Sequence, residues 1–277
     1  MLVLKVGGGL SIDRRAFCED VASLVADGQE VIVVHGGARE TNEISERLGK
    51  PPRFVTSVSG YSSRFTDEET MEIFAMVYAG KANTAITALL RRLGVNALGM
   101  SGVDGGLAQG SRKNVLKVVD EGRPRVLRGD HSGRVERVNG SLLRLLLQEG
   151  YTPVVSPPAI SHAGEVINVD GDRMAAAFAG ALKVDDLVIF TDRPGLLRDP
   201  DCEDSLIDGI CAEELDGATE YAQGRMRVKL LAAREALGAG VSRVTLADGR
   251  RDRPVRRALA GEGTTITASP GERVVAR

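Results

Sequence analysis

Short runs of Val, Ile and Leu recur along this chain, and each run is followed by a helical pattern. Residues 2–6, LVLKV, and 31–35, VIVVH, are continuous apolar strands, whereas 14–26 has the periodicity of a helix. Strands that are apolar along their whole length are typical of parallel sheets with helices on both faces. The chain is therefore expected to form an α/β fold, a three-layer α/β/α sandwich around an open, mostly parallel sheet.

The same alternation predicts the other elements of the sheet and of its two helical layers. Further helices are predicted at 39–48, 67–78, 81–93, 140–149, 172–182, 225–238 and 253–260, and further strands at 95–100, 152–156, 186–190, 243–247 and 264–268. Thr66 or Asp67 can cap the helix that follows it. The pattern restarts near residue 170, which predicts an N-terminal lobe, 1–170, and a C-terminal lobe, 171–277, within one continuous fold.

Composition excludes several classes of protein. The net charge of −2 gives no global indication of nucleic-acid binding, and the three cysteines and three histidines form no zinc-ligand spacing. An odd, sparse set of cysteines without a CxxC pair is typical of a reducing cytoplasm. The N-terminal residues, MLVLKVGGG, lack the flanks of a signal peptide, and no uninterrupted apolar run reaches the length of a membrane span. We therefore expect a cytoplasmic protein without a membrane segment.

Residues 111–138 differ from the rest of the chain, because short strand-like segments are joined there by Gly and Asp turns. This pattern predicts a β-hairpin excursion from the α/β core. The segment contains eight Lys or Arg residues against four Asp or Glu residues. It contains no aromatic residue for base stacking, so an acidic protein matches it better than nucleic acid does. A solvated charged hairpin without a partner is the alternative.

Two Gly-rich turns directly follow the first two predicted strands. They are KVGGGL, residues 5–10, and HGGA, residues 35–38. Glycines at the end of a parallel strand let backbone N–H groups approach an anion closely, so the two turns predict a phosphate cradle. Neither turn has the spacing of a P-loop or of a dinucleotide-binding fingerprint. The alternative is that the glycines only make tight strand-to-helix connections.

Several charged residues stand at positions where apolar or capping residues would be expected. Lys5 interrupts an apolar strand, and Lys229 lies toward the packed side of its predicted helix. Asn168, Asp170 and Asp172 precede an Ala-rich helix, at the end of a strand, where open α/β sheets bind ligands. The alternatives are a lysine that reaches solvent at the end of the strand, a helix N-cap at Asp172 and a solvated Lys229.

Taken together, these motifs resemble the amino acid kinase family. The resemblance rests on LKVGG, VVHGG, NVDGD, FTDRPGLLRDP and GRMRVK, which occur in this order along nearly the whole chain. Within the family, the chain is similar to the N-acetylglutamate kinase branch. The resemblance implies a phosphotransferase that moves a phosphoryl group from ATP to a side-chain carboxylate. Such a carboxylate is ionised at neutral pH, which explains why no histidine is needed as a general base.

The stretch around Arg64 indicates which kinases within the family this chain resembles. Relatives that act on free N-acetylglutamate carry the compact GLRVTD, whereas this chain carries GYSSRFTD, with Gly60 four residues before Arg64. The longer form and a basic hairpin comparable to 111–138 resemble kinases whose substrate is attached to a small acidic amino-group carrier protein. The implied substrate is carrier-bound L-2-aminoadipate, and the implied pathway is lysine biosynthesis. In this hypothesis Arg64 pairs with the α-carboxylate of the substrate.

Two other functions remain open on the sequence alone. The first is an N-acetylglutamate kinase, or a kinase of carrier-bound glutamate, in arginine biosynthesis. One methylene separates glutamate from aminoadipate, and such a difference is worth only about 1–3 kcal/mol of discrimination. The second is a non-catalytic amino-acid-sensing subunit, which should lack one of the residues that handle the phosphoryl group. Lys5, Asp172 and Lys229 are all present, and this argues against a sensor.

The resemblance also implies a role for each matching residue. Lys5 would contact the transferring phosphoryl group, Lys229 the leaving β-phosphate side, and Asp172 would orient both lysines. Substrate would be held by Gly36, Gly37, Arg64 and Asn168. The nucleotide would be held by Gly8, Asp192, Gly195 and Leu197. The carrier protein would meet Arg112, Lys113, Arg123, Arg125 and Arg128.

The implied cofactors are ATP and Mg²⁺, with the metal held mainly by ATP phosphates and by no dedicated protein ligands. Arg225 departs from the family, which commonly has a second glycine there, and it leaves the local geometry open. A homodimer is implied. Because the chain begins directly at the first strand, without the N-terminal helix of hexameric relatives, we expect a dimer that arginine does not inhibit.

Overall fold

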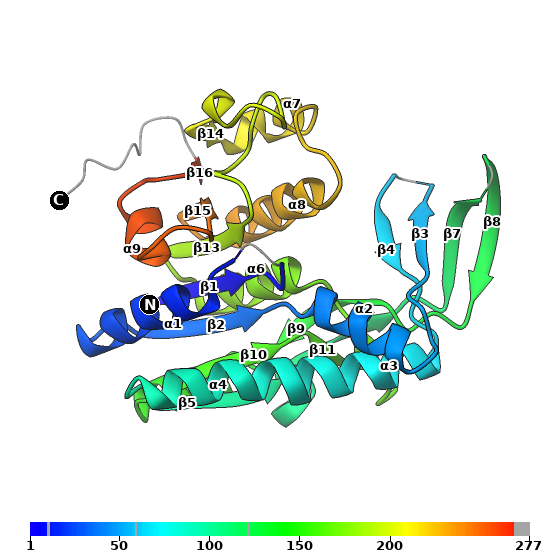
Figure 1. Ribbon diagram of the computed structural model, residues 1–277, viewed down its shortest axis with the longest axis horizontal. Helices are drawn as coiled ribbons and strands as arrows, with labels where there is room; N and C mark the ends of the chain where they lie inside the picture. The colour runs from blue at the N-terminus through cyan, green and yellow to red at the C-terminus, as the bar shows by residue number, and fades with distance from the viewer. Residues whose placement is uncertain (10–11, 59, 121, 269–277) are drawn as a thin grey trace.

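The computed structural model describes residues 1–9, 12–58, 60–120 and 122–268. Its centre is an eight-stranded sheet (Figure 1). In spatial order the strands are β14 (Gly209–Cys211), β16 (Thr264–Thr267), β15 (Arg243–Asp248), β13 (Asp186–Thr191), β1 (Leu2–Val6), β2 (Val31–His35), β10 (Thr152–Ser156) and β5 (Ala97–Ser101). All neighbouring strands are parallel except β15 and β16. The predicted mostly parallel sheet is confirmed.

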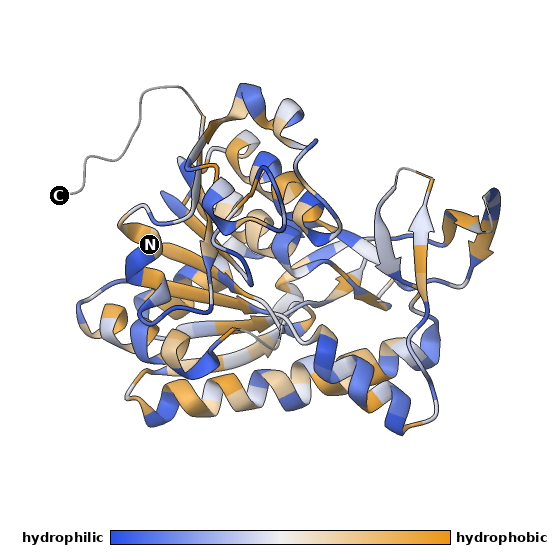
Figure 2. Ribbon diagram, turned by 45° about the horizontal axis from the view of Figure 1, so that its top comes forward, coloured by the Kyte–Doolittle hydropathy of each residue, from blue (hydrophilic) through white to orange (hydrophobic). Residues whose placement is uncertain are grey.

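Helices cover both faces of this sheet. One layer contains α1 (Arg14–Ala26), α4 (Asn83–Arg92) and α9 (Pro254–Leu259), and the other contains α5 (Gly140–Gln148), α6 (Gly171–Leu182) and α8 (Arg225–Gly238). Alternate residues of β1 serve the two layers, because Val3 packs with α6 and α8 whereas Leu2 and Leu4 pack with α1 and α9. Figure 2 shows hydrophobic residues along the central strands between these layers. The three-layer sandwich is therefore confirmed.

Two smaller sheets extend this core. The first consists of β12 (Val166–Asn168), β11 (Pro158–Ser161), β6 (Ala108–Arg112) and β9 (Gly133–Val138), and the second of β4 (Ser62–Arg64), β3 (Phe54–Ser57), β7 (Val115–Asp120) and β8 (Arg123–Arg128). The second sheet projects away from the sandwich (Figure 1). The predicted hairpin is confirmed as β7 and β8, but β9 pairs with β6 in the other sheet. Strands β3 and β4 were not predicted.

A single long helix lies along one edge of the molecule (Figure 1). It joins α3 (Glu68–Ala75), a π-helical segment (Met76–Ala82) and α4 without a break. The prediction of two separate helices was wrong, because the chain passes through Gly80 as a π-helix. Asp67 caps the helix by accepting a hydrogen bond of 2.9 Å from the Thr70 N–H. The whole helix is 25 residues long and apolar enough to cross a membrane, but Ile86 and Leu90 pack with α1 in the core.

The predicted boundary between lobes falls in the turn before α6. The central sheet crosses this boundary, since β1 of the first lobe pairs with β13 of the second. The functional division into 1–170 and 171–277 stays a prediction. Helix α2 (Ala38–Arg47) follows β2, and helix α7 (Leu215–Ala218) precedes α8.

Candidate functional site

Three charged side chains meet inside the protein where α6 and α8 face the end of β1. The Lys5 Nζ lies 2.6 Å from the Asp172 Oδ1, and the Lys229 Nζ lies 3.0 Å from the Asp172 Oδ2. All three residues are less than a tenth exposed. Two lysines share the Asp172 carboxylate. The pKa of the nearby Asp170 is raised by burial and by the charge of Asp172, so the cluster favours an additional anionic partner. The structure thus brings together the three residues that the resemblance implies to be catalytic.

The strand pattern explains why Lys5 points into this cluster. Lys5 lies two residues after Val3, so its side chain leaves β1 on the same face, toward α6 and α8. Asp172 stands in the first turn of α6, and the N-cap of that helix is Asp170, which accepts hydrogen bonds from the N–H groups of Asp172 and Arg173. The alternative in which Asp172 is the plain cap is wrong. The carboxylate of Asp172 instead contacts Lys5 and Lys229.

Electrostatics keep the carboxylate of this cluster ionised. Burial would raise the pKa of Asp172, but the charges of Lys229 and Lys5 outweigh burial and hold that pKa below its usual range. Burial lowers the pKa of Lys229, and the charge of Asp172 opposes this effect. The ionised Asp172 carboxylate therefore holds both lysine side chains in place, an arrangement that suits the binding of phosphate oxygens.

The two Gly-rich turns lie against each other beside this cluster. A Cβ atom at Gly8 would stand 2.7 Å from the backbone N of Gly37, and one at Gly36 would stand 2.8 Å from the backbone N of Gly8. A Cβ atom at Gly171 would lie 3.5 Å from the Lys5 Cε. The close approach of backbone to backbone requires glycine at Gly8 and Gly36. The Gly36 N–H donates to the Val6 carbonyl at 2.8 Å, so the N–H groups of Gly8 and Gly37 are the candidates for an anion cradle.

The contact between the two turns gives a direct test with a matched control. We expect Gly8→Ala to lower both activity and melting temperature, because its methyl group would overlap the Gly37 backbone. Gly9→Ala is the control, since a Cβ atom at Gly9 meets nothing within 4 Å. Thermal unfolding and steady-state kinetics of the two variants check this prediction. Equal behaviour of the two variants would show that the close contact has no importance.

Arg64 lies at the end of β4, where it faces α2. It is less than a tenth exposed, and its Nη2 donates to the Asn42 Oδ1 at 2.5 Å and to the Ala38 carbonyl at 3.4 Å. The Arg64 Cζ lies 5.2 Å from the centre of the Phe54 ring. Among the described residues the other terminal nitrogen, Nη1, has no hydrogen-bond partner although it is buried. An unpaired buried guanidinium N–H is a candidate for an incoming carboxylate.

The position of Arg225 was left open by the sequence, and the structure places its charge near this guanidinium. Burial lowers the pKa of Arg64, and the positive charge of Arg225 lowers it further. The turn between β3 and β4 also approaches α8, because a Cβ atom at Gly60 would lie 3.5 Å from the Arg227 Nη1. The β3–β4 hairpin and the start of α8 therefore face each other across the end of the lysine cluster.

Asn168 is tied to the same region by backbone and side chain. Its N–H donates to the His131 carbonyl at 2.8 Å, and its Nδ2 donates to the Thr66 hydroxyl at 3.0 Å. The Thr66 N–H in turn donates to the fully buried Asp130 carboxylate at 2.8 Å. From the sequence Thr66 was named only as a possible helix cap, a role that Asp67 takes, and Asp130 was counted only among the acids of the hairpin segment. They join the projecting sheet to the candidate substrate site.

Gly8 follows β1, and the other residues predicted to hold the nucleotide follow β13. Asp192 is exposed at the end of that strand, and the Thr191 hydroxyl lies 3.3 Å from its carboxylate. Gly195 is buried, and a Cβ atom there would stand 2.5 Å from the Thr264 hydroxyl oxygen. Leu197 is buried and forms an isolated bridge with Leu206. Asp192 is thus the most accessible side chain of this set, while Gly195 and Leu197 shape the segment.

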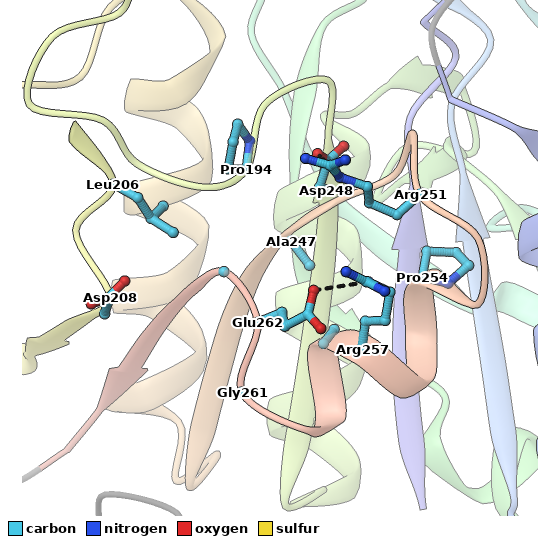
Figure 3. Close-up of a pocket in the computed structure, with 12 residues that line it drawn as sticks. Pro194, Leu206, Asp208, Ala247, Asp248, Arg251, Pro254, Arg257, Gly261 and Glu262 are labelled. Carbon is cyan, nitrogen blue, oxygen red and sulfur yellow. Dashed lines mark hydrogen bonds and ion pairs between the residues drawn. The ribbon is translucent and has the colours of Figure 1, made fainter. Parts of the chain in front are cut away.

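A cavity of about 390 Å³ lies beside this segment (Figure 3). Pro194, the end of β15 and the turn after α9 line it, and an ion pair of 2.8 Å joins two of its lining residues, Arg257 and Glu262. The residues of the lysine cluster do not belong to its lining. The cavity is therefore distinct from the candidate catalytic cluster.

The basic residues proposed to meet the carrier are not equivalent. Arg112, on β6, is partly buried, donates to the Asp130 carbonyl at 2.8 Å and forms an ion pair with Glu165, so it ties the residues after β8 to the sheet that contains β6. Lys113, Arg123, Arg125 and Arg128 are exposed. The last three belong to β8, at the outer edge of that sheet.

Comparisons with known proteins agree with this geometry. The model of the amino acid kinase family matches residues 1–248. A "[LysW]-aminoadipate kinase" of Deinococcus radiodurans is 51% identical over 96% of this chain and 91% of its own length, and one of Thermus thermophilus is 49% identical over 96% and 100%. An "Acetylglutamate kinase" of Methanopyrus kandleri is 39% identical over 96% of this chain and its whole length.

Solved structures share the fold at lower identity. An N-acetylglutamate synthase of Neisseria gonorrhoeae superimposes with a TM-score of 0.79 at 24% identity, and this chain covers 59% of that longer protein. A carbamate kinase of Giardia lamblia superimposes with a TM-score of 0.67 at 15% identity over 97% of this chain and 98% of the other. With a family match over most of its length and relatives near 50% identity, this chain belongs to the amino acid kinase family.

Proposed function

We propose that this protein uses ATP to phosphorylate the side-chain carboxylate of L-2-aminoadipate attached to a small acidic carrier protein, as a step of lysine biosynthesis. The observation that carries the proposal is the buried Lys5–Asp172–Lys229 cluster beside the paired glycine turns. The substrate class is supported by the similarity to two kinases that are named for LysW-bound aminoadipate. A non-catalytic sensing subunit is not supported, because all three charged residues are present and in contact.

The chemistry needs positioning and charge neutralisation more than proton transfer. A carboxylate oxygen attacks the γ-phosphorus of ATP, the bond to the β–γ bridging oxygen breaks, and ADP leaves with the electron pair. The acceptor carboxyl group has a reference pKa of roughly 4.3, so it is already ionised when the substrate binds. In this proposal Lys5 neutralises the transferring phosphoryl group, Lys229 the leaving phosphate, and Asp172 keeps both ammonium groups in place.

Mg²⁺ would supply further neutralisation when it is bound to the ATP phosphates. The described residues contain no group of three or more His, Cys, Asp or Glu side chains arranged to hold a metal. The ionised Asp172 is already occupied by two lysines. These residues fit a metal that is held mainly by the nucleotide, as is common for Mg²⁺ in phosphoryl transfer.

The projecting sheet supports a carrier-bound substrate. Arg64, on β4, and the basic strand β8 belong to the same four-stranded sheet. Asp130, just after β8, contacts Thr66, just after β4, so the basic surface ends at the candidate substrate site. A globular acidic partner on β8 could therefore direct an attached amino acid toward Arg64. The implied homodimer stays a prediction that analytical ultracentrifugation would check.

The first experiment compares four acceptors with the purified chain, ATP and Mg²⁺. Acyl phosphate is trapped as the hydroxamate, with carrier–aminoadipate, carrier–glutamate, N-acetylglutamate and N-acetylaminoadipate as substrates. We expect strong turnover of the carrier-linked substrates, and the ratio of the first two assigns the pathway. Efficient turnover of free N-acetylglutamate would overturn the carrier proposal. Turnover of none would overturn the proposed function.

The basic strand provides a second test. We expect Arg123→Ala with Arg128→Ala to raise KM for carrier–aminoadipate by about tenfold or more at low salt, because exposed charges act mainly on encounter and affinity. The kcat should be unchanged, because both residues lie on the outer strand of the projecting sheet. Arg91→Ala with Arg92→Ala, on α4, is the matched control. A KM that stays constant in the β8 variant would remove this strand from the carrier surface.

A further inference from the structure

The π-helical segment of the long helix lies against the second glycine turn. π-Helical geometry is rare and is often found at functional sites. Tyr78 lies within the segment Met76–Ala82, Asn83 directly follows the segment, and both side chains are buried. His35, which is fully buried, lies near both and immediately precedes Gly36. The catalytic scheme above uses none of these three side chains.

A chain of hydrogen bonds leads from Asn83 to the glycine turn. The Asn83 Nδ2 donates to the Val154 carbonyl at 2.8 Å, and it lies 3.0 Å from the His35 Nε2. An amide nitrogen is only a donor, so the His35 Nε2 must accept. In a neutral imidazole the other nitrogen then carries the proton, and the His35 Nδ1 lies 3.0 Å from the Gly36 carbonyl oxygen. Asn83 therefore selects the tautomer that can donate to Gly36.

Tyr78 lies beside Gly37, on the other side of the peptide bond that joins Gly36 to Gly37. Its ring stacks on His35, with centroids 6.5 Å apart and an angle of 19° between the planes. A Cβ atom at Gly37 would lie 3.4 Å from that ring, so the ring covers the glycine. Burial raises the pKa of Tyr78 to about 12, and the Gly37 backbone N–H, which faces the phenol oxygen, opposes this rise. The phenol thus stays protonated beside the Gly37 amide.

We propose that Asn83, His35 and Tyr78 are positioning residues that fix the orientation of the Gly36–Gly37 peptide. A trans peptide is planar, with its carbonyl oxygen and its N–H pointing in opposite directions. Holding the Gly36 oxygen on one side therefore sets the direction of the Gly37 N–H on the other. The inference rests on the proposed function, in which the second glycine turn helps to hold the substrate.

The inference needs a neutral His35 across the working pH range. Burial lowers the pKa of His35 to about 4, an effect that the hydrogen bond with the Gly36 backbone opposes. The charged groups that act on it are Arg14, Glu40 and Lys5. Since this pKa lies below the ordinary value, the imidazole stays neutral from pH 5 upward. The peptide is then held in one orientation at any pH at which the kinase would work.

Nitrogen NMR of the imidazole groups tests the tautomer without any substrate. The chain has three histidines, so His35→Gln assigns the signal of His35 by difference. We expect a neutral ring with the proton on Nδ1 that does not titrate between pH 5 and 8. A proton on Nε2, or titration above pH 6, would overturn the inference. This measurement remains valid even if the proposed function fails.

Kinetics test the link to the reaction. We expect Tyr78→Phe, which keeps the ring, to lower kcat for carrier–aminoadipate about tenfold with KM for ATP within threefold of the unmodified chain. Tyr151→Phe, at a tyrosine 38% exposed, is the matched control. Activity equal to that of the control would overturn the inference. A loss that follows a lowered melting temperature would also overturn it, because the role would then be structural. Inactivity of the unmodified chain would instead refute the proposed function.

Asn83→Asp gives a sharper outcome. A carboxylate accepts from Nε2–H, so the neutral ring of His35 can no longer donate to Gly36. We expect kcat to fall about tenfold or more at pH 8 and to recover partly toward pH 6, where the new carboxylate favours a doubly protonated ring. The unmodified chain should show no such recovery. A pH profile parallel to that of the unmodified chain in a folded variant would contradict the proposed tautomer.

Discussion

Replacing Lys5 with methionine is expected to lower kcat by about 10³-fold or more, while the protein stays folded. The loss of one preorganised group that stabilises charge in the transition state typically costs about 10²–10³-fold. Lys5 carries one of the two positive charges of the cluster, so its loss leaves Asp172 paired with Lys229 alone. A neutral ion pair offers no excess charge to the phosphoryl group. Hydroxamate trapping with saturating substrates measures the effect on kcat.

The pairing within the cluster also predicts which variant damages folding. Lys5→Met leaves the buried carboxylate with one partner, so the melting temperature should change little. Asp172→Asn removes the carboxylate that contacts both buried lysines, and breaking such a buried pair costs about 3–5 kcal/mol. Lys183→Met, at an exposed lysine, is the control. If Lys5→Met retained more than a tenth of the kcat, Lys5 would have no direct part in phosphoryl transfer.

The presence of Lys5 and Asp172 in the lysine cluster could be anticipated from the sequence because their signals are local. A lysine in an apolar strand and a carboxylate at the start of an Ala-rich helix are visible within short windows. The period of two along β1 also assigns Lys5 to the face of Val3, which packs on α6 and α8. The distance between Lys5 and Lys229 in the chain does not matter, since each is placed by its own element.

The projecting sheet was predicted only in part, because its pairing is not local. Strand β3 pairs with β7, so that Thr56 stands opposite Val119, and β4 is short and rich in serine. Serine and glycine are poor strand formers, and the stretch therefore looks like a loop until a partner is known. The role of Arg112 was hidden in the same way, because its partner Glu165 lies 53 residues further along the chain.

The π-helical segment was missed for a different physical reason. The apolar spacing on each side of Gly80 is that of an ordinary helix, and a glycine between two such patterns favours a break. What holds the helix together there is tertiary. Tyr78 stacks on Phe74 with centroids 4.0 Å apart, and Asn83 bonds to the Val154 carbonyl of β10. Local propensity is overridden by contacts that no short window contains.

Replacing Arg64 with lysine is expected to lower kcat/KM for carrier–aminoadipate about a hundredfold, mainly through KM. Lysine keeps the charge but loses the planar fork that binds a carboxylate with two parallel hydrogen bonds. One terminal nitrogen of Arg64 already serves Asn42, and the other is buried without a described partner, so it is the one that a substrate carboxylate would meet. Arg53→Lys is the matched control, since that exposed arginine stacks on Phe65 nearby. If KM were unchanged in both Arg64→Lys and the control, Arg64 would not bind the α-carboxylate of the substrate. Its role would then be to hold the β3–β4 hairpin against α2.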